Sequence, residues 1–243
     1  MNFYALIIGT EILNGRREDK HFEFLKNELQ KYGHELFASF VIKDDKELIE
    51  RAFEMVKADK DGVLFSFGGI GSTPDDLTRE ISAKVFTDSK MAPHKEFLQD
   101  ILDRFGDRAY PHRIHMADLP INAELLFNPI NNMSGYSLEK RYFFTPGFPS
   151  MAHPMICDVI KKYFSHSEKK YRKTLIAKTS EESLITLMQQ LPTTIELSCL
   201  PMFVDEKANV ELSLVSEDTA ILQNYFQLFV DDLEEKNIEY RLS

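Results

Sequence analysis

The residues with the clearest chemical potential are Asp75 and Asp76, which follow a glycine-rich turn. That turn, Gly68-Gly69-Ile70-Gly71, comes directly after Val63–Phe67, an apolar run typical of a buried strand in a parallel sheet. Glycines leave backbone N–H groups unobstructed, and N–H groups at a strand-to-helix turn favour a bound phosphate. Two carboxylates would repel a bare phosphate, but Mg²⁺ is commonly held by one or two carboxylates together with phosphate oxygens. The segment therefore predicts metal-assisted chemistry on a phosphate group.

The residues after this turn predict the start of a helix. Thr73 suits the N-cap and Pro74 the first helical position, so the N–H groups from Gly69 through Ser72 to Thr73 would hold the phosphate. Helix capping is an alternative explanation for the two aspartates, because acidic residues in a first turn complement the helix dipole. The turn matches neither the dinucleotide-binding pattern G-x-G-x-x-G nor the P-loop pattern.

Three blocks of the sequence resemble the MoaB/Mog molybdopterin-binding family, in the branch that contains the N-terminal domain of CinA. Ile8–Arg16, followed by Asp19, resembles G-[DT]-E-[IL]-L-x-G-R-x-x-D-[TK]-N, with His21 in place of the asparagine. The glycine-rich block GGIGSTPDDLT resembles GG-[LI]-G-P-T-x-D-D-[LIT]-T, with Ser72 in place of proline. The third block, Thr145–Met151, resembles P-G-V-P-S-x-M.

The resemblance implies a crevice for a nucleotide or pterin phosphate. Glu11 follows the first strand and Asp76 the third, so both carboxylates reach one crevice if those strands are neighbours. Asp76 and Glu11 are then the expected catalytic groups. Together with Asp19, they are the expected ligands of a divalent metal such as Mg²⁺, Mn²⁺ or Co²⁺.

Two further segments could contact the ligand. Gly147 to Pro149, with Ser150 as a helix cap, could offer N–H groups to an anion, and the resemblance implies that this loop faces the pterin or nucleotide. A rigid connector between strand and helix is the alternative. Arg113 corresponds to an arginine of the family segment N-x-R-L-R-M-A-x-[IL]-P and could clamp a phosphate, whereas His115 replaces another arginine there. A solvated surface helix is the alternative for that segment.

The resemblance leaves three functions open. CinA-branch domains are associated with pyrophosphatase activity on ADP-ribose-like dinucleotides, which is the first expectation. The second is a protein of molybdenum-cofactor biosynthesis that binds molybdopterin or transfers an adenylyl group. The MoaB pattern G-G-T-G-x-[ST]-P-R-D argues against this function, because the chain has Ile70 in place of the threonine and Asp75 in place of the arginine. The third is a non-catalytic binding module, favoured by the departures at His21, Ser72 and His115.

Composition restricts the class of partner and the compartment. The 243 residues carry a net charge of -10, so a nucleic-acid backbone would be repelled. The two cysteines, Cys157 and Cys199, have no metal-type spacing, which favours a reducing compartment. No apolar run is long enough to span a membrane, and the apolar start of the chain resembles a strand rather than a signal peptide. We expect a cytoplasmic protein with a small-molecule ligand, and the resemblance implies a dimer or trimer.

The chain predicts two domains. Strands and helices alternate over residues 1–165, which predicts a three-layer α/β sandwich around a mostly parallel sheet. Ser165–Lys170 is polar and is expected to be a linker. Residues 171–243 follow the order β-α-β-β-α-β, a small ferredoxin-like α+β unit without a catalytic constellation, for which packing or dimerisation is expected. The printed sequence offers no equivalent of the C-terminal deamidase domain of full-length CinA, so that activity is not expected.

Overall fold

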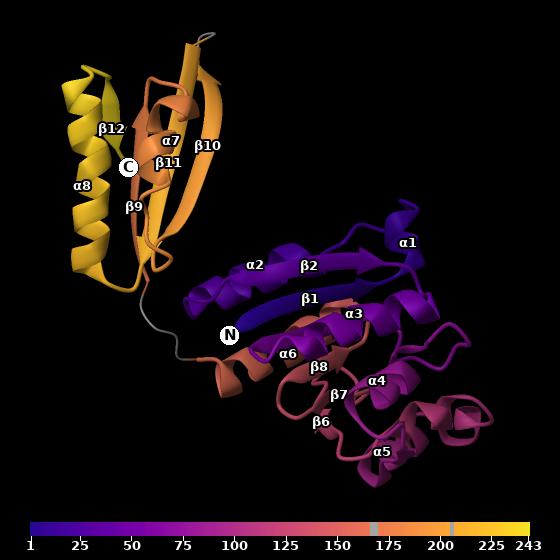
Figure 1. Ribbon diagram of the computed structural model, residues 1–243. Helices are drawn as coiled ribbons and strands as arrows, with labels where there is room; N and C mark the ends of the chain where they lie inside the picture. The colour runs from indigo at the N-terminus through magenta and orange to yellow at the C-terminus, as the bar shows by residue number, and fades with distance from the viewer. Residues whose placement is uncertain (166–169, 205–206) are drawn as a thin grey trace. The chain divides into compact units, whose positions relative to one another are not determined.

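A computed structural model describes residues 1–165, 170–204 and 207–243. The chain divides into two compact units, Met1–Ser167 and Glu168–Ser243 (Figure 1). Most of the expected linker, Ser165–Lys170, lies outside the described residues.

A six-stranded mixed sheet forms the centre of the first unit, in the order β2-β1-β3-β8-β7-β6 (Figure 1). The first four strands in this order are parallel to one another, and β7 runs antiparallel to both of its neighbours, β8 and β6. This confirms the predicted mostly parallel sheet. The strands are β1 (Asn2–Ile8), β2 (Leu36–Ile42), β3 (Gly62–Phe67), β6 (Glu124–Leu126), β7 (Gly135–Leu138) and β8 (Tyr142–Thr145).

Helices cover both faces of this sheet and create two cores. Alternate residues of β1 enter opposite cores: Phe3, Ala5 and Ile7 pack on one face, and their neighbours pack on the other. A strand buried on both faces needs a nearly continuous apolar run, which is why β1 and β3 were recognisable in the sequence. One face carries α2 (His21–Lys31) and α6 (Pro149–Tyr163); the other carries α3 (Lys46–Ala58), α4 (Thr78–Phe86) and α5 (Lys95–Phe105).

Shorter elements complete the first unit. A one-turn helix, α1, follows β1, and a two-stranded antiparallel sheet flanks α5 together with two 3-10 turns. These elements are α1 (Thr10–Leu13), β4 (Met91–Pro93), β5 (Asp118–Pro120), η1 (Gly106–Ala109) and η2 (Arg113–Ala117).

Two predicted helix starts differ from the structure. The helix after the glycine-rich turn does not begin at Pro74; α4 begins at Thr78, because the residues before it form an irregular turn that folds back on Thr78. Ser150 does not cap α6, since Pro149 already occupies the first helical position and Phe148 the N-cap. A proline fits that first position because its φ is fixed and it needs no hydrogen-bond acceptor there.

The second unit is a four-stranded antiparallel sheet in the order β10-β11-β9-β12 (Figure 1). Alternate residues of β9 and β11 pack with the apolar stripe of α8, which begins after Asp218. The α+β order of elements confirms the predicted ferredoxin-like unit. The elements are β9 (Tyr171–Ala177), η3 (Glu181–Leu184), α7 (Ile185–Met188), β10 (Glu196–Val204), β11 (Lys207–Ser216), α8 (Thr219–Glu235) and β12 (Tyr240–Leu242). In neither unit does a helix within the described ranges have the length and apolarity to cross a membrane.

Candidate functional site

Three loops leave the sheet at the carboxyl ends of neighbouring parallel strands. Ile7 of β1 pairs with Phe67 of β3, and Phe67 pairs in turn with Thr145 of β8. The loop carrying Glu11, the glycine-rich turn and the loop carrying Gly147 therefore start from the same edge. The condition set by the sequence, that the first and third strands be neighbours, is met. Open α/β sheets bind their ligands at this edge.

Thr78 fixes the first half of the glycine-rich turn. Its hydroxyl Oγ1 donates to the carbonyl of Gly68 at 3.0 Å, and its backbone N–H donates to the carbonyl of Gly69 at 3.0 Å. Thr78 is fully buried at the first position of α4, so these two carbonyls are turned toward the protein.

Arg79 fixes the second half in the same way. Its Nη1 donates to the carbonyl of Ile70 and, at 2.5 Å, to the carbonyl of Gly71. The side chain is buried, and this burial lowers the pKa of the guanidinium below its ordinary value. A buried guanidinium must bond acceptors in the protein, and here the acceptors are carbonyls of the turn.

These carbonyl contacts dictate where the N–H groups of the turn point. In a trans peptide the N–H lies opposite the preceding carbonyl. Because the carbonyls of residues 68–71 face Thr78 and Arg79, the N–H groups of residues 69–72 face away from them. None of these N–H groups has an acceptor among the residues that the structure describes. The turn thus presents consecutive free donors, an arrangement that suits a phosphate.

Close contact with the neighbouring strands requires glycine at Gly68. Its φ is +103°, and a Cβ there would lie 2.3 Å from the carbonyl oxygen of Ile8 at the end of β1. Its N–H donates to the carbonyl of Thr145 at 2.9 Å. A Cβ at Gly147 would lie 3.4 Å from the Cα of Gly68, so the β8 loop also touches the turn.

Asp75 and Asp76 surround one hydroxyl. Oγ1 of Thr73 lies 2.5 Å from Oδ1 of Asp75 and 2.6 Å from Oδ2 of Asp76, which also accepts from the N–H of Thr73 at 2.8 Å. The helix-capping alternative is wrong for these aspartates, because the N-cap of α4 is Leu77 and no side chain caps that helix. A hydroxyl has one proton and cannot donate to both carboxylates. A divalent cation, which prefers oxygen ligands, fits this oxygen cluster.

The other two expected metal ligands have different partners. Oε1 of Glu11 lies 3.5 Å from Nη1 of Arg17. Asp19 precedes Lys20, the N-cap of α2, and its carboxylate accepts from the first N–H groups of that helix, those of His21 at 2.8 Å and Phe22 at 3.1 Å. Within the described part of the chain, no three His, Cys, Asp or Glu side chains lie close enough to share a metal ion. The predicted metal centre built jointly from Glu11, Asp19 and Asp76 is thus not assembled in the described residues, because the three carboxylates do not form one cluster.

His21 contacts the backbone of the β8 loop and the end of β3. Its Nε2 donates to the carbonyl of Gly147 at 3.3 Å, and its ring stacks on Phe67 at a centroid distance of 4.3 Å. Burial lowers the pKa of His21, and burial also lowers the pKa of the neighbouring His153 to about 4. The histidine that replaces the family asparagine is thus buried, and it bonds the backbone of the β8 loop.

The structure does not bring Arg113 to the three loops. Its Nη1 donates to the carbonyl of Arg108 at 2.8 Å, and its guanidinium lies 4.9 Å from the ring centroid of Phe105. His115 pairs with Asp118, with 2.8 Å between Nδ1 and Oδ2. These contacts are all local to α5, η1, η2 and β5, in agreement with the alternative of a surface segment.

Sequence reasoning did not identify three residues that shape this site, Thr78, Arg79 and Arg17, and it gave no role to the Phe148 side chain within the predicted loop. Thr78 is the last residue of the GGIGSTPDDLT block, and membership of that block was the only indication in the sequence that Thr78 belongs to the site. Arg17 lies beside Phe148, with 5.3 Å between its guanidinium and the ring centroid, although the two residues are far apart in the chain. Such contacts arise from the fold and leave no spacing pattern in the sequence.

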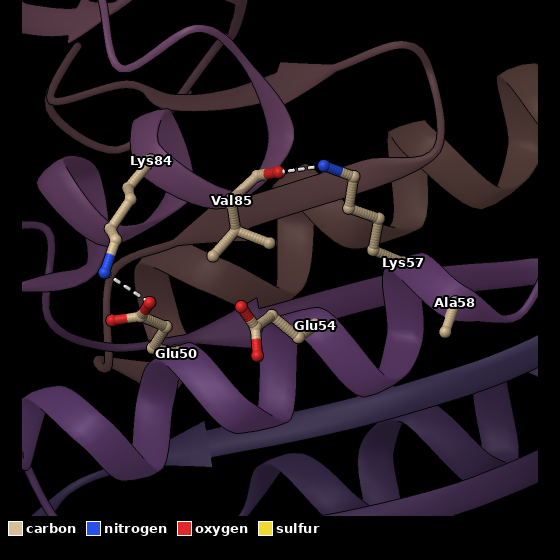
Figure 2. A pocket seen from close by; sticks show the side chains of 6 residues that line it. All are labelled: Glu50, Glu54, Lys57, Ala58, Lys84 and Val85. Carbon is tan, nitrogen blue, oxygen red and sulfur yellow. Dashed lines mark hydrogen bonds and ion pairs between the residues drawn. The ribbon is translucent and has the colours of Figure 1, made fainter.

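A separate hollow lies between α3 and the C-terminal half of α4 (Figure 2). Its two lysines are already engaged: Lys84 pairs with Glu50, and Lys57 donates to the carbonyl of Val85. Both ammonium groups therefore already have partners in the protein, so the hollow does not suggest an anion-binding site. The glycine-rich turn precedes the opposite end of α4, so this hollow is separate from the candidate site.

Comparison with known proteins identifies the family. A family model described as a probable molybdopterin binding domain matches residues 4–166, which include all three loops of the candidate site. The chain belongs to this family. The predicted MoaB/Mog and CinA resemblance is thereby confirmed.

Individual relatives carry CinA-like names. A CinA-like protein from Acaryochloris marina is 34% identical over 158 residues, covering 62% of this chain and 37% of the relative. A CinA-like protein from Flavobacterium psychrophilum is 28% identical over 248 residues, covering 96% and 59%. The crystal structure of CinA from Thermoplasma acidophilum, titled as of unknown function, has a TM-score of 0.60 and 28% identity, covering 67% of this chain and 98% of that one. The chain spans well under half the length of the first of these relatives.

Proposed function

We propose that the first unit is a metal-dependent pyrophosphatase that hydrolyses the phosphoanhydride of an ADP-ribose-like dinucleotide. One observation carries the proposal: the free N–H groups of residues 69–72 lie in the same turn as the paired carboxylates of Asp75 and Asp76. The donors suit phosphate oxygens, and the carboxylates suit a cation that accompanies them.

Each part of the turn has a distinct role in this proposal. Thr78 and Arg79 hold the carbonyls inward, so that the N–H groups bind the phosphates. Asp75 and Asp76 would hold a divalent cation such as Mg²⁺, Mn²⁺ or Co²⁺, with substrate oxygens as further ligands. Such a cation neutralises charge on the phosphates and lowers the pKa of a bound water. Water adds to one phosphorus, the bridging P–O bond breaks, and ADP-ribose yields AMP and ribose 5-phosphate.

The test is AMP release from ADP-ribose, FAD and NAD, and adenosine bisphosphate release from coenzyme A, each with Mg²⁺, Mn²⁺ or Co²⁺. In Asp76→Asn the amide oxygen can still accept from Thr73, so the fold should persist while the cation is held less well. We expect metal-dependent release to fall by about 100-fold or more, since cation catalysis contributes several kcal/mol. Asp88→Asn is the matched control, because Asp88 is an exposed carboxylate paired with Lys90. Full activity in folded Asp76→Asn would refute the role of this carboxylate.

Molybdopterin binding is the second candidate, and the family description favours it. The same free N–H groups could bind the phosphate of a pterin instead of that of a nucleotide. Tight binding of molybdopterin, or its adenylylation by ATP, with no release from the dinucleotide panel would select this function. Release of AMP without pterin binding would exclude it.

A further inference from the structure

Phe148 and Arg17 form an exposed pair on the two loops that flank the glycine-rich turn in the order of strands. The Phe148 side chain is 54% exposed although it is a large apolar group, and the Arg17 guanidinium lies 5.3 Å from the centroid of its ring. We infer that this pair stacks against the planar heteroaromatic ring of a phosphorylated ligand. The inference rests on the proposed function, because the phosphate bound by the turn fixes the position of such a ligand.

The position of Phe148 follows from the clamping of Gly147. The carbonyl of Gly147 accepts from the buried ring of His21, and a Cβ at Gly147 would lie 3.4 Å from the Cα of Gly68. Phe148 is therefore one residue away from a backbone contact with the turn. It is also the N-cap of α6, so its backbone is fixed by the helix that follows.

Arg17 is fixed from the other side of the site. Its backbone N–H donates to the carbonyl of Glu11 at 3.0 Å, and its Nη1 lies 3.5 Å from Oε1 of the same residue. The guanidinium is thereby directed across from the β1 loop to the β8 loop. The pair thus joins two of the three loops, with the phosphate-binding turn between them in the order of strands.

The chemistry of the pair selects the class of ligand. The phenyl ring and the guanidinium are both flat, and each stacks on aromatic bases, whereas a sugar phosphate has no aromatic ring to stack on them. Phe148 has no place in the core between the sheet and α6, so its exposed ring is available to a ligand. A nucleobase and a pterin share this chemistry, and the experiment separates them.

The experiment compares AMP, neopterin monophosphate and ribose 5-phosphate by isothermal titration in the presence of Mg²⁺. Phe148→Leu keeps an apolar side chain but removes the flat ring, and Phe148→Tyr restores a ring. We expect Phe148→Leu to weaken binding of AMP, of the pterin or of both by about 10-fold or more, as for other aromatic platforms. Ribose 5-phosphate should bind to both proteins equally, and Phe148→Tyr should recover the loss. Phe127→Leu is the matched control, since Phe127 is also an exposed phenylalanine but lies in the loop between β6 and β7.

The outcomes separate the inference from the proposed function. If wild-type protein binds ribose 5-phosphate as well as the ring-bearing ligands, or if Phe148→Leu weakens all three equally, the stacking role is wrong and the phosphate site remains. If none of the three phosphates binds to the folded protein, the phosphate site itself is refuted, and the stacking inference fails with it. A larger loss for AMP identifies a nucleobase, and a larger loss for neopterin monophosphate identifies a pterin.

Discussion

Substitution of Gly68 by alanine should test the close contact on which the site depends. A Cβ would lie 2.3 Å from the carbonyl oxygen of Ile8, so the backbones of β1 and the turn would have to separate by about 0.7 Å. Overpacking of this kind costs about 1–3 kcal/mol, and the φ of +103° adds about 1–2 kcal/mol for a residue with a Cβ. The more restricted unfolded chain of the alanine variant offsets up to ~1 kcal/mol. We expect a net loss of about 2–4 kcal/mol in the free energy of unfolding.

Gly106→Ala is the control for backbone strain alone. Gly106 also has a positive φ, +52°, but no atom lies within 4 Å of the position of its Cβ. We expect a loss of about 1 kcal/mol or less there. Native-state hydrogen exchange of the β1 and β3 amides, read by mass spectrometry, measures the stability of the first unit separately from that of the second. Equal losses at both glycines would refute the close approach between the turn and β1, and with it the geometry proposed for the phosphate.

Two further predictions concern pH and the second unit. Burial lowers the pKa of His153 from 6.5 to about 4, so the unfolded chain binds a proton first as the pH falls, and stability is lost between about pH 6.5 and pH 4. The full difference corresponds to about 3 kcal/mol, which solvent screening at this partly exposed side chain reduces to about 1–2 kcal/mol. Urea unfolding at pH 7.5 and pH 4.5 should show a smaller pH effect in His153→Phe, and an unchanged effect would contradict this assignment. Asp218 accepts from two N–H groups at the start of α8, so Asp218→Ala should cost the second unit about 1 kcal/mol. Hydrogen exchange should show reduced protection of the α8 amides and unchanged protection of the β1 amides. Asp218→Asn is the control, because asparagine keeps a hydrogen-bond acceptor. Reduced protection of the β1 amides would contradict separate unfolding of the two units.

The alternation of strands and helices was available from the sequence because it depends on local pattern. β1 and β3 are continuous apolar runs, since both their faces are buried, and the glycine-rich turn directly follows β3. The order of elements in the second unit was equally visible. The helix starts near the site could not be predicted from the sequence. The start of α4 is set by the hydrogen bonds of Thr78 and Arg79 to the glycine-rich turn, and such contacts do not follow from local residue propensity.

The sequence by itself determined that a glycine-rich turn, two aspartates and a second glycine-containing loop would follow strands of one sheet. Only the tertiary structure decided which atoms of these segments are free to act. It bonded the Asp19 carboxylate to the first N–H groups of α2, left Arg113 beside Phe105, and turned the carbonyls of the glycine-rich turn toward Arg79. The physical reason is that hydrogen-bonding groups are consumed by partners distant in the chain, and residue type and spacing do not record which groups remain unpaired.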